Sequence, residues 1–165
     1  TDHEGEPLEK QRESEGHLWV RGPSVVERYF GQDDPATRNG WFPTGDLAQI
    51  SQDGQLFITG RAKELIKSGG EWINPTEIEA VVSGLPEVAF AAVVGRQHEK
   101  WGERPVLLVQ FREGESLADD TLRATLKAHV PSWWLPDAVI RIPDMPLAAT
   151  GKIDKIRLRS LYGAA

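Results

Sequence analysis

Charged residues lie beside glycines in three short segments of the chain, and these segments are the candidates for a chemical site. They are GWFPTGD at 40–46, GRAKELIKSGGEWINPTEIE at 60–79 and PLAATGKIDK at 146–155. The last of them enters a basic tail, 152–159, in which four cations stand against one acid. Such a tail in an acidic chain suits a small anionic ligand such as a nucleotide, but a solvated terminal helix carries the same charges. Charge alone therefore leaves both interpretations open.

Each segment also has an ordinary structural interpretation when it is taken alone. Thr44-Gly45-Asp46 could be a turn with an Asx-type hydrogen bond, and Ser68-Gly69-Gly70 could be a flexible loop. Gly151-Lys152 could be the approach to a helix with a solvated lysine, since a phosphate-binding loop needs a fuller glycine pattern. The chemical interpretation therefore depends on finding all three segments together, in this order.

Hydrophobic patterns predict two regions of different structure that meet near residue 60. In the first, HLWVRG at 17–22 predicts a strand, and LAQI and QLFITG flank the turn SQDG. Asp53-Gly54 between two apolar runs favours a β-hairpin. This region has few apolar positions to bury by itself, so it is expected to belong to a larger β-rich body.

The region from 61 onward mixes helix and strand patterns. Asn74-Pro75-Thr76-Glu77 predicts a helix start, because proline favours the first helical position and acids favour the first turn. EVAFAAVVG at 87–95 and RPVLLVQF at 104–111 predict two strands packed in a small sheet, and AVIRI at 138–142 predicts a third.

Further helices are expected at 116–130 and 154–161. The predicted fold class is α+β, with a small mixed sheet and flanking helices. We expect this domain at 61–165, a size of roughly 100 residues that can fold independently. The β-rich segment at 1–60 is expected to precede it.

Composition excludes several classes of function. The chain has 165 residues, a net charge of −6 and no cysteine. Disulfides, thiolate catalysis and cysteine-bound metals are therefore excluded, and nucleic-acid binding is disfavoured. The four histidines lack ligand spacing, so no metal site is expected. The apolar runs are too short to span a bilayer, and the polar start at Thr1 resembles an interior cut rather than a signal peptide. We expect a cytoplasmic protein.

In this order and spacing, the three segments resemble the ANL superfamily of adenylate-forming enzymes. This superfamily includes acyl-CoA synthetases, luciferases and the adenylation domains of peptide synthetases. The resemblance covers essentially the whole chain and is strongest at 40–79 and 146–157. It implies that a carboxylate is joined to the α-phosphate of ATP, with release of pyrophosphate, and that the acyl group then passes to a thiol. It also implies that 1–60 ends the large N-terminal domain and that 61–165 is the mobile C-terminal domain.

The resemblance assigns nucleotide contacts to residues of this sequence. Asp46 matches the carboxylate that accepts hydrogen bonds from both ribose hydroxyls, for which it has two acceptor oxygens. Arg61 matches the basic residue that also contacts the ribose. Lys152 matches the lysine that reaches into the active site during adenylation, where an ammonium group stabilises charge on the α-phosphate. Lys152 is therefore the expected catalytic residue.

The resemblance also implies that the small domain presents two faces in turn. Lys63 occupies the position of the hinge, although an exposed lysine at a strand end would look the same. One face carries Lys152 for adenylation. The other is expected to bind CoA through four residues, Lys67, Ser68, Gly69 and Gly70, whose glycines allow close backbone approach to pantetheine.

Three tryptophans leave alternatives open. Trp72 could pack near the ligand or fill the domain core. The pair Trp133-Trp134 favours hydrophobic packing over stacking on the adenine of CoA. The segment SGGEWINPTEIE is closer in character to acyl-CoA ligases of medium- or long-chain acids than to peptide synthetases, and the alanines of PLAATGK replace a more polar residue found in many relatives.

These observations predict the C-terminal part of an ATP-dependent acyl-CoA ligase that is inactive without its own N-terminal domain. ATP, CoA and a carboxylic acid are the expected substrates. The phosphate loop, the acyl pocket and the Mg²⁺ ligands are expected to precede Thr1, so fatty, aromatic and short-chain acids all stay open. One alternative is transfer to a carrier protein or oxidation as in luciferases. Another is a non-catalytic module that binds a nucleotide or CoA.

Overall fold

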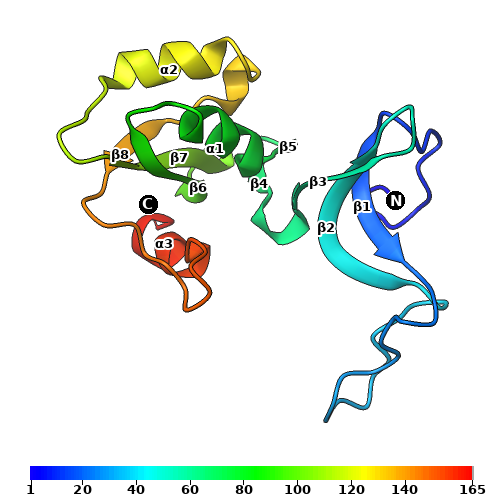
Figure 1. Ribbon diagram of the computed structural model, residues 1–165. Coiled ribbons are helices and arrows are strands. Elements are labelled where there is room, and N and C mark those ends of the chain that lie inside the picture. Colours follow the sequence, from blue (N-terminus) through cyan, green and yellow to red (C-terminus); the bar gives the residue numbers. More distant parts are fainter. Residues whose placement is uncertain (165) are drawn as a thin grey trace. The chain divides into compact units, whose positions relative to one another are not determined.

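The computed structural model describes residues 1–164, which form two compact units (Figure 1). The first unit comprises Thr1–Lys63, and the second begins at Glu64. The boundary between the two units therefore follows Lys63, the residue expected at the hinge.

The first unit is a three-stranded antiparallel sheet in the order β1-β2-β3. Its strands are β1 Glu15–Val20, β2 Phe42–Ile50 and β3 Leu56–Arg61. The predicted hairpin joins β2 to β3: Ser51 N donates to Gln55 O at 2.9 Å, and Gly54 has a φ of +90°. Within the described part of this unit only Leu47 and Ala48 are buried, so the sheet has little core of its own.

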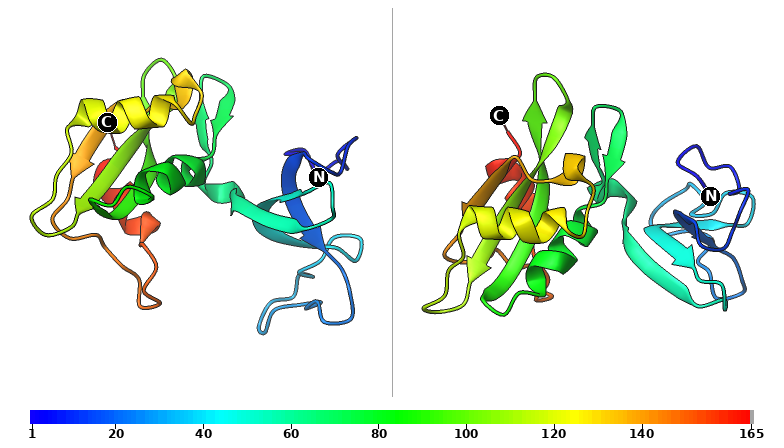
Figure 2. Two further views of the ribbon diagram at one scale, coloured as in Figure 1. Left: turned by 45° about the horizontal axis from the view of Figure 1, so that its top comes forward. Right: turned by 90° about the horizontal axis from the view of Figure 1, so that it is seen from above.

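The second unit is built on a five-stranded mixed sheet (Figures 1 and 2). Its strands are β4 Ile66–Ser68, β5 Glu71–Ile73, β6 Val88–His98, β7 Gly102–Phe111 and β8 Ala138–Arg141. β6 and β7 pair antiparallel along nearly their whole length, whereas β8 runs parallel to β7. The predicted mixed sheet and its three predicted strands are confirmed.

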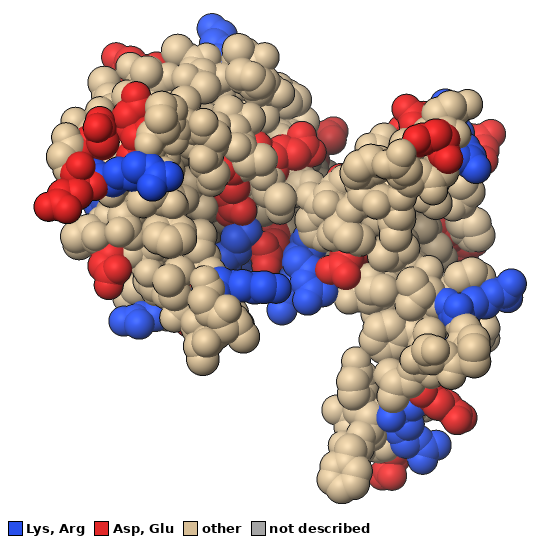
Figure 3. All heavy atoms as spheres, viewed as in Figure 1, with Lys and Arg blue, Asp and Glu red and all other residues tan. Residues whose placement is uncertain are grey.

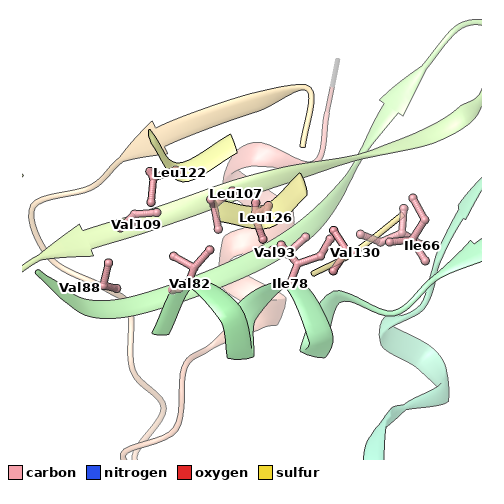
Figure 4. Packing of buried hydrophobic residues seen from close by; sticks show 12 residues of the cluster. Ile66, Ile78, Val82, Val88, Val93, Leu107, Val109, Leu122, Leu126 and Val130 are labelled. Carbon is pink, nitrogen blue, oxygen red and sulfur yellow. The ribbon is translucent and has the colours of Figure 1, made fainter. Parts of the chain in front are cut away.

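Helices cover both faces of this sheet. They are α1 Pro75–Ser83, α2 Asp119–Lys127 and α3 Lys155–Tyr162. Because side chains alternate along a strand, Ala91 and Val93 of β6 pack in the core formed with α1 and α2, which Figure 4 shows. Ala92 and Val94 point the other way and pack in the core formed with Leu158 of α3.

The helix predicted at 116–130 is shorter than expected, because α2 covers only Asp119–Lys127. Ala118 has extended backbone, with φ −68° and ψ 150°, so the helix cannot begin before it. At the other end, Pro131 disfavours helical backbone at the residue before it. A short 3-10 helix, η2 Ser132–Trp134, follows instead.

The starts of α1 and α3 agree with the sequence. Asn74 Oδ1 accepts a hydrogen bond from Thr76 N at 3.1 Å, and Pro75 takes the first helical position. Asp154 Oδ1 accepts one from Arg157 N at 3.0 Å. Both helices thus have side-chain caps that satisfy backbone N–H groups of their first turns.

Residues 66–73 form a tight hairpin, so the flexible-loop interpretation of Ser68-Gly69-Gly70 is wrong. β4 and β5 pair antiparallel, and both turn residues have positive φ, +60° at Gly69 and +96° at Gly70. Positive φ at both central positions is typical of the two-residue turn that matches strand twist, and it favours glycine. Gly69 also lies against Trp101: it donates to Trp101 O at 2.8 Å, and an added Cβ would lie 2.7 Å from Trp101 Cε3.

An ion cluster ties the beginning of the second unit to its end. Lys155 Nζ lies 2.6 Å from Glu64 Oε2 and 2.9 Å from Glu79 Oε2. Glu79 also accepts a hydrogen bond from Val93 N at 2.6 Å, and its side chain is only 15% exposed. Burial raises the pKa of Glu79, while the charge of Lys155 acts in the opposite direction. One ammonium group thereby joins α3 to α1 and to Glu64, the last residue of the 3-10 helix η1, Ala62–Glu64, and the Glu79 carboxylate extends the cluster to β6.

Replacing Lys155 with methionine is expected to lower the free energy of unfolding by about 2–3 kcal/mol at neutral pH, because two carboxylates lose their cation in a partly buried place. The loss should grow as the pH rises from below the ordinary pKa of a glutamate to above the raised pKa of Glu79. The pKa of Glu79 in the folded chain lies above its unfolded value, so the folded state binds the extra proton at low pH and is destabilised as that proton leaves. Without the charge of Lys155 the pKa of Glu79 rises further, so the pH range over which the folded state loses this stability widens. Urea unfolding at a series of pH values measures the effect.

Glu79→Gln in the Lys155→Met background is the control. The amide keeps the shape of the side chain but does not ionise, so most of the pH dependence of the loss should disappear. A loss of the same size at both ends of the pH range would contradict this account of the cluster.

Gly69→Ala is expected to cost about 1–3 kcal/mol of stability, from left-handed backbone and from overlap with Trp101. Gly70→Ala is the matched control, because its φ of +96° is also unfavourable but nothing lies within 4 Å of the added Cβ. In a Trp101→Ala background the cost of Gly69→Ala should fall, while the cost of Gly70→Ala should not change. Thermal unfolding of this double-mutant cycle measures the coupling. An equal cost of Gly69→Ala in both backgrounds would show that Trp101 does not restrict the turn.

Candidate functional site

Asp46 and Arg61 face each other across β2 and β3. They are Cα partners in the antiparallel register, and Arg61 Nη1 lies 2.8 Å from Asp46 Oδ1. The same nitrogen donates to Thr44 O at 3.2 Å. The carboxylate side chain is 27% exposed and the guanidinium side chain 49%, so the pair is open to a ligand. The structure thus brings together two residues that the sequence assigned to one nucleotide.

The segment before Asp46 is held by a threonine. Asp46 N donates to Thr44 Oγ1 at 3.1 Å, and Thr44 Oγ1 donates to Leu18 O at 3.0 Å. The Asx-type interpretation of this turn is therefore wrong, because the accepting side chain belongs to Thr44. Gly45 between them has a φ of +77°, which favours glycine there. The carboxylate of Asp46 is left to face Arg61.

Lys152 lies on a closed loop just before α3. Ala148 N donates to Lys152 O at 2.7 Å, and Leu147 and Ile153 form an antiparallel bridge. Asp154 N donates to Pro146 O at 2.8 Å, which closes the base of the loop. The side chain of Lys152 is exposed, and no ion pair within residues 1–164 involves it. The loop therefore fixes the backbone of Lys152 and leaves its ammonium group available.

The expected CoA-binding residues lie on the β4–β5 hairpin. Lys67 and Trp72 are cross-strand partners, and Lys67 Nζ lies 5.2 Å from the centre of the Trp72 ring. Trp72 is 41% exposed, so the core-filling interpretation is wrong. Ser68 is buried, and its Oγ accepts a hydrogen bond from Arg104 Nη1 at 3.0 Å. Lysine and tryptophan are thus exposed at this turn, while serine anchors it.

A cavity of about 330 Å³ adjoins the glycine turn. Its lining comes from the hairpin, from the adjoining ends of β6 and β7 and from the connection between them: Lys67, Gly70, Gln97, Trp101, Gly102 and Glu103. Trp101 is 43% exposed, and Lys100 Nζ lies 4.5 Å from the centre of its ring. Trp101 was not among the site residues expected from the sequence. A tryptophan next to a glycine in a short connection between two strands was the available signal.

The second tryptophan pair divides between core and surface. Trp133 and Trp134 meet edge to face, with ring centres 5.7 Å apart. Trp134 packs against the core formed with α1 and α2, which confirms hydrophobic packing for that residue. Trp133 is 41% exposed.

The candidate residues are distributed over both units. Asp46, Arg61 and Lys63 belong to the first unit, and Lys63 is exposed within η1. Within the second unit, the β4–β5 hairpin and the loop of Lys152 lie at different places around the sheet (Figures 1 and 2). The second unit thus has two separate candidate surfaces.

Charge distribution does not by itself select a phosphate site. On the face drawn in Figure 3, Lys and Arg side chains are interspersed with Asp and Glu side chains on each unit. Among the described residues, no group of three or more His, Cys, Asp or Glu side chains could hold a metal ion. No helix in the described part of the chain is long and apolar enough to cross a membrane. Individual residues, rather than a charged surface, therefore define the candidate site.

Comparison with known proteins connects these features. Residues 77–152 match the family described as the AMP-binding enzyme C-terminal domain. The chain is 41% identical over 98% of its length to a 3-methylmercaptopropionyl-CoA ligase of Ruegeria pomeroyi. It is 42% identical over 99% of its length to a medium-chain-fatty-acid–CoA ligase of Ectopseudomonas oleovorans. The chain spans only 30% of the length of each of these two relatives.

Solved structures agree with this result. ATP-bound MatB from Rhodopseudomonas palustris superposes with a TM-score of 0.84 at 31% identity, over 92% of this chain and 31% of that one. The amide bond synthetase McbA from Marinactinospora thermotolerans superposes with a TM-score of 0.87 at 29% identity, over 97% of this chain and 33% of that one. The chain belongs to the ANL superfamily of adenylate-forming enzymes and corresponds to their C-terminal portion.

Proposed function

We propose that this chain is the C-terminal part of an ATP-dependent acyl-CoA ligase. The reaction converts a carboxylic acid, ATP and CoA to acyl-CoA, AMP and pyrophosphate, through an acyl-adenylate. The observation that carries the proposal is the Asp46–Arg61 pair, which presents a carboxylate and a guanidinium at 2.8 Å in a partly exposed position. The curated relatives support it, because two that match almost the whole chain are named CoA ligases. CoA is therefore favoured over a carrier protein as the acceptor.

In the adenylation step, the substrate carboxylate attacks the α-phosphorus of ATP and the bond to pyrophosphate breaks. Asp46 accepts hydrogen bonds from the ribose hydroxyls, and Arg61 holds the carboxylate in place while it also contacts the ribose. Lys152 brings an ammonium group to the α-phosphate as negative charge builds there. Its exposed side chain and closed backbone loop suit a group that is inserted into a site formed elsewhere in the protein. Mg²⁺ would be held by residues outside this chain.

In the thioester step, the thiol of CoA attacks the acyl carbonyl and AMP leaves. The β4–β5 hairpin is the surface of this chain that would line the pantetheine path. Gly70 has open space beside its Cα, and Lys67 and Trp72 are exposed on the same hairpin. Lys63, at the end of the first unit, is the proposed pivot that exchanges the Lys152 surface for the hairpin surface.

The acid is proposed to be a fatty or related carboxylic acid. The two relatives compared above act, by their names, on a thioether-containing acid and on medium-chain fatty acids. A Thermus thermophilus relative named as a long-chain-fatty-acid–CoA ligase is 37% identical over 98% of this chain.

Lys152→Ala in the full-length protein that carries this chain is expected to slow acyl-adenylate formation by about 10²–10³-fold. Thioester formation from pre-made acyl-adenylate and CoA should change little, since the ammonium group acts on the phosphate in the first step. Pyrophosphate release measures the first step, and acyl-CoA formation measures the second. Lys127→Ala is the matched control, because it removes the same charge from an exposed position on α2. Survival of the first step in Lys152→Ala would contradict the proposed function.

Asp46→Asn is expected to raise the KM for ATP by about 10- to 100-fold, the loss associated with a hydrogen bond to a charged group. Asp53→Asn in the β2–β3 turn is its control, because Asp53 is an exposed carboxylate of the same unit that bonds only to neighbours in its own turn. Initial rates of pyrophosphate release at varied ATP concentrations check both variants. Unchanged ATP dependence in Asp46→Asn would remove Asp46 from the nucleotide site.

A further inference from the structure

Arg104 of β7 has every N–H donor of its guanidinium engaged. Nε donates to Asp137 Oδ1 at 3.0 Å, and Nη2 donates to the same oxygen at 2.8 Å. Nη2 also donates to Leu135 O at 3.1 Å. Nη1 donates to Trp133 O at 2.8 Å and to Ser68 Oγ at 3.0 Å. The side chain is only 15% exposed, so these bonds are made in a largely desolvated place.

These bonds join two segments that are far apart in the sequence. Ser68 is the last residue of β4 and directly precedes the Gly69-Gly70 turn. The other partners belong to 133–137, which runs from within η2 to the residue before β8. One guanidinium thus fixes the turn proposed to line the pantetheine path to a second segment that carries the exposed Trp133.

Ile66 and Ile73 of the hairpin pack in the core with β6 and β7, but the hairpin has few other polar attachments to the sheet. β4 pairs with β7 through the single Cα pair Ser68 and Gly102. Gly69 N donates to Trp101 O, and Lys67 N reaches Glu103 Oε2 at the long distance of 3.3 Å. Because a three-residue strand makes few ladder bonds, a charged hydrogen bond to the buried Ser68 hydroxyl is a large part of what orients the turn.

The segment at 133–137, in contrast, is held by two arginines, Arg104 and Arg123. Arg123 of α2 donates to Pro136 O at 2.6 Å and to Asp137 O at 3.0 Å. Asp137 N also donates to Pro105 O at 3.0 Å. Arg123 makes no bond to Ser68 among the described residues. The two arginines therefore share one partner segment and differ in their connection to the hairpin.

We propose that Arg104 is a positioning residue for the thioester-forming step, which acts by holding the Ser68–Gly70 turn and the 133–137 segment as one rigid surface toward CoA. This inference rests on the function proposed above. Arg104 does not touch the reacting atoms, since its donors are used within the protein. Its effect is confined to CoA, because the loop of Lys152 has no bond to this network among residues 1–164.

A lysine cannot replace Arg104 in this role. The guanidinium is a planar fork that reaches oxygens on three sides at once, whereas an ammonium group is a compact charge with three donors on one nitrogen. Arg104→Lys keeps the charge and much of the volume, but three donors on one nitrogen cannot reproduce all five bonds, so it must give up the bond to Ser68 or bonds to the 133–137 segment. This variant therefore tests the connection rather than the charge.

The experiment compares the two half-reactions in the full-length protein with Arg104→Lys and Arg104→Gln. Pyrophosphate release with 3-methylthiopropionate or octanoate reports adenylation, and acyl-CoA formation from the pre-made adenylate at varied CoA reports the second step. We expect the KM for CoA to rise about 10- to 100-fold in both variants, the loss associated with a misplaced binding group. Adenylation should stay within about twofold of the wild-type rate.

Arg123→Lys is the matched control, because it disturbs the same 133–137 segment but not Ser68. It should leave the KM for CoA within about twofold of wild type, by the same kinetic measurement. Equal losses in both half-reactions, or no change in either, would overturn the positioning role while the proposed ligase function stands. A wild-type protein that forms acyl-adenylate but no acyl-CoA contradicts CoA as the acceptor, and this inference fails with it.

Discussion

The second unit depends on burying both faces of the β6–β7 hairpin. Val106, Leu107, Leu108 and Val109 are each at most 1% exposed, so no residue in this stretch of β7 can face water. A strand pair buried on both sides needs a cover on each, and the cover here is α1 with α2 on one face and α3 on the other. The apolar run RPVLLVQF therefore determines that helices must lie on opposite sides of the sheet.

The two candidate surfaces of this unit follow from that arrangement. The connection between β6 and β7 places Trp101 against Gly69, and β7 carries Arg104 beside Ser68, so one end of the hairpin supports the glycine turn. The opposite face of the sheet receives α3, and the loop that precedes α3 carries Lys152. Two candidate surfaces can thus lie on one small domain, because the same buried strands support the glycine turn at one end and α3 on one face.

The sequence was sufficient for features whose cause is local. Asp53-Gly54 specifies a hairpin through its own backbone preferences, and Asn74-Pro75 specifies a helix start through a cap and a fixed φ. The long strands β6 and β7 were visible because continuous apolar runs of this length are typical of strands buried on both faces. The β4–β5 hairpin was missed as a strand pair, because strands of three residues are too short to show a period.

Contacts between distant residues could not be predicted in this way. Arg104 and Ser68 are 36 positions apart, and Lys155 is 91 positions from Glu64. Nothing in the residue types near Arg104 or Lys155 indicates which of many acids and hydroxyls each will meet. Among the proposed site residues, the Asp46–Arg61 pair is closer to being predictable, because the Asp53-Gly54 turn brings the two flanking strands together.

The ion cluster at Lys155 links the candidate residues at the two ends of the second unit. Lys155 follows Lys152 by three positions, and Glu64 directly follows Lys63. The bond of 2.6 Å between Lys155 Nζ and Glu64 Oε2 therefore fixes the base of the Lys152 loop to the first residue of the unit. A rotation of backbone at Lys63 would then carry the Lys152 loop as part of one body, without a flexible segment between them. The raised pKa of Glu79 is the cost of placing this connection partly out of water, and Lys155 offsets that cost.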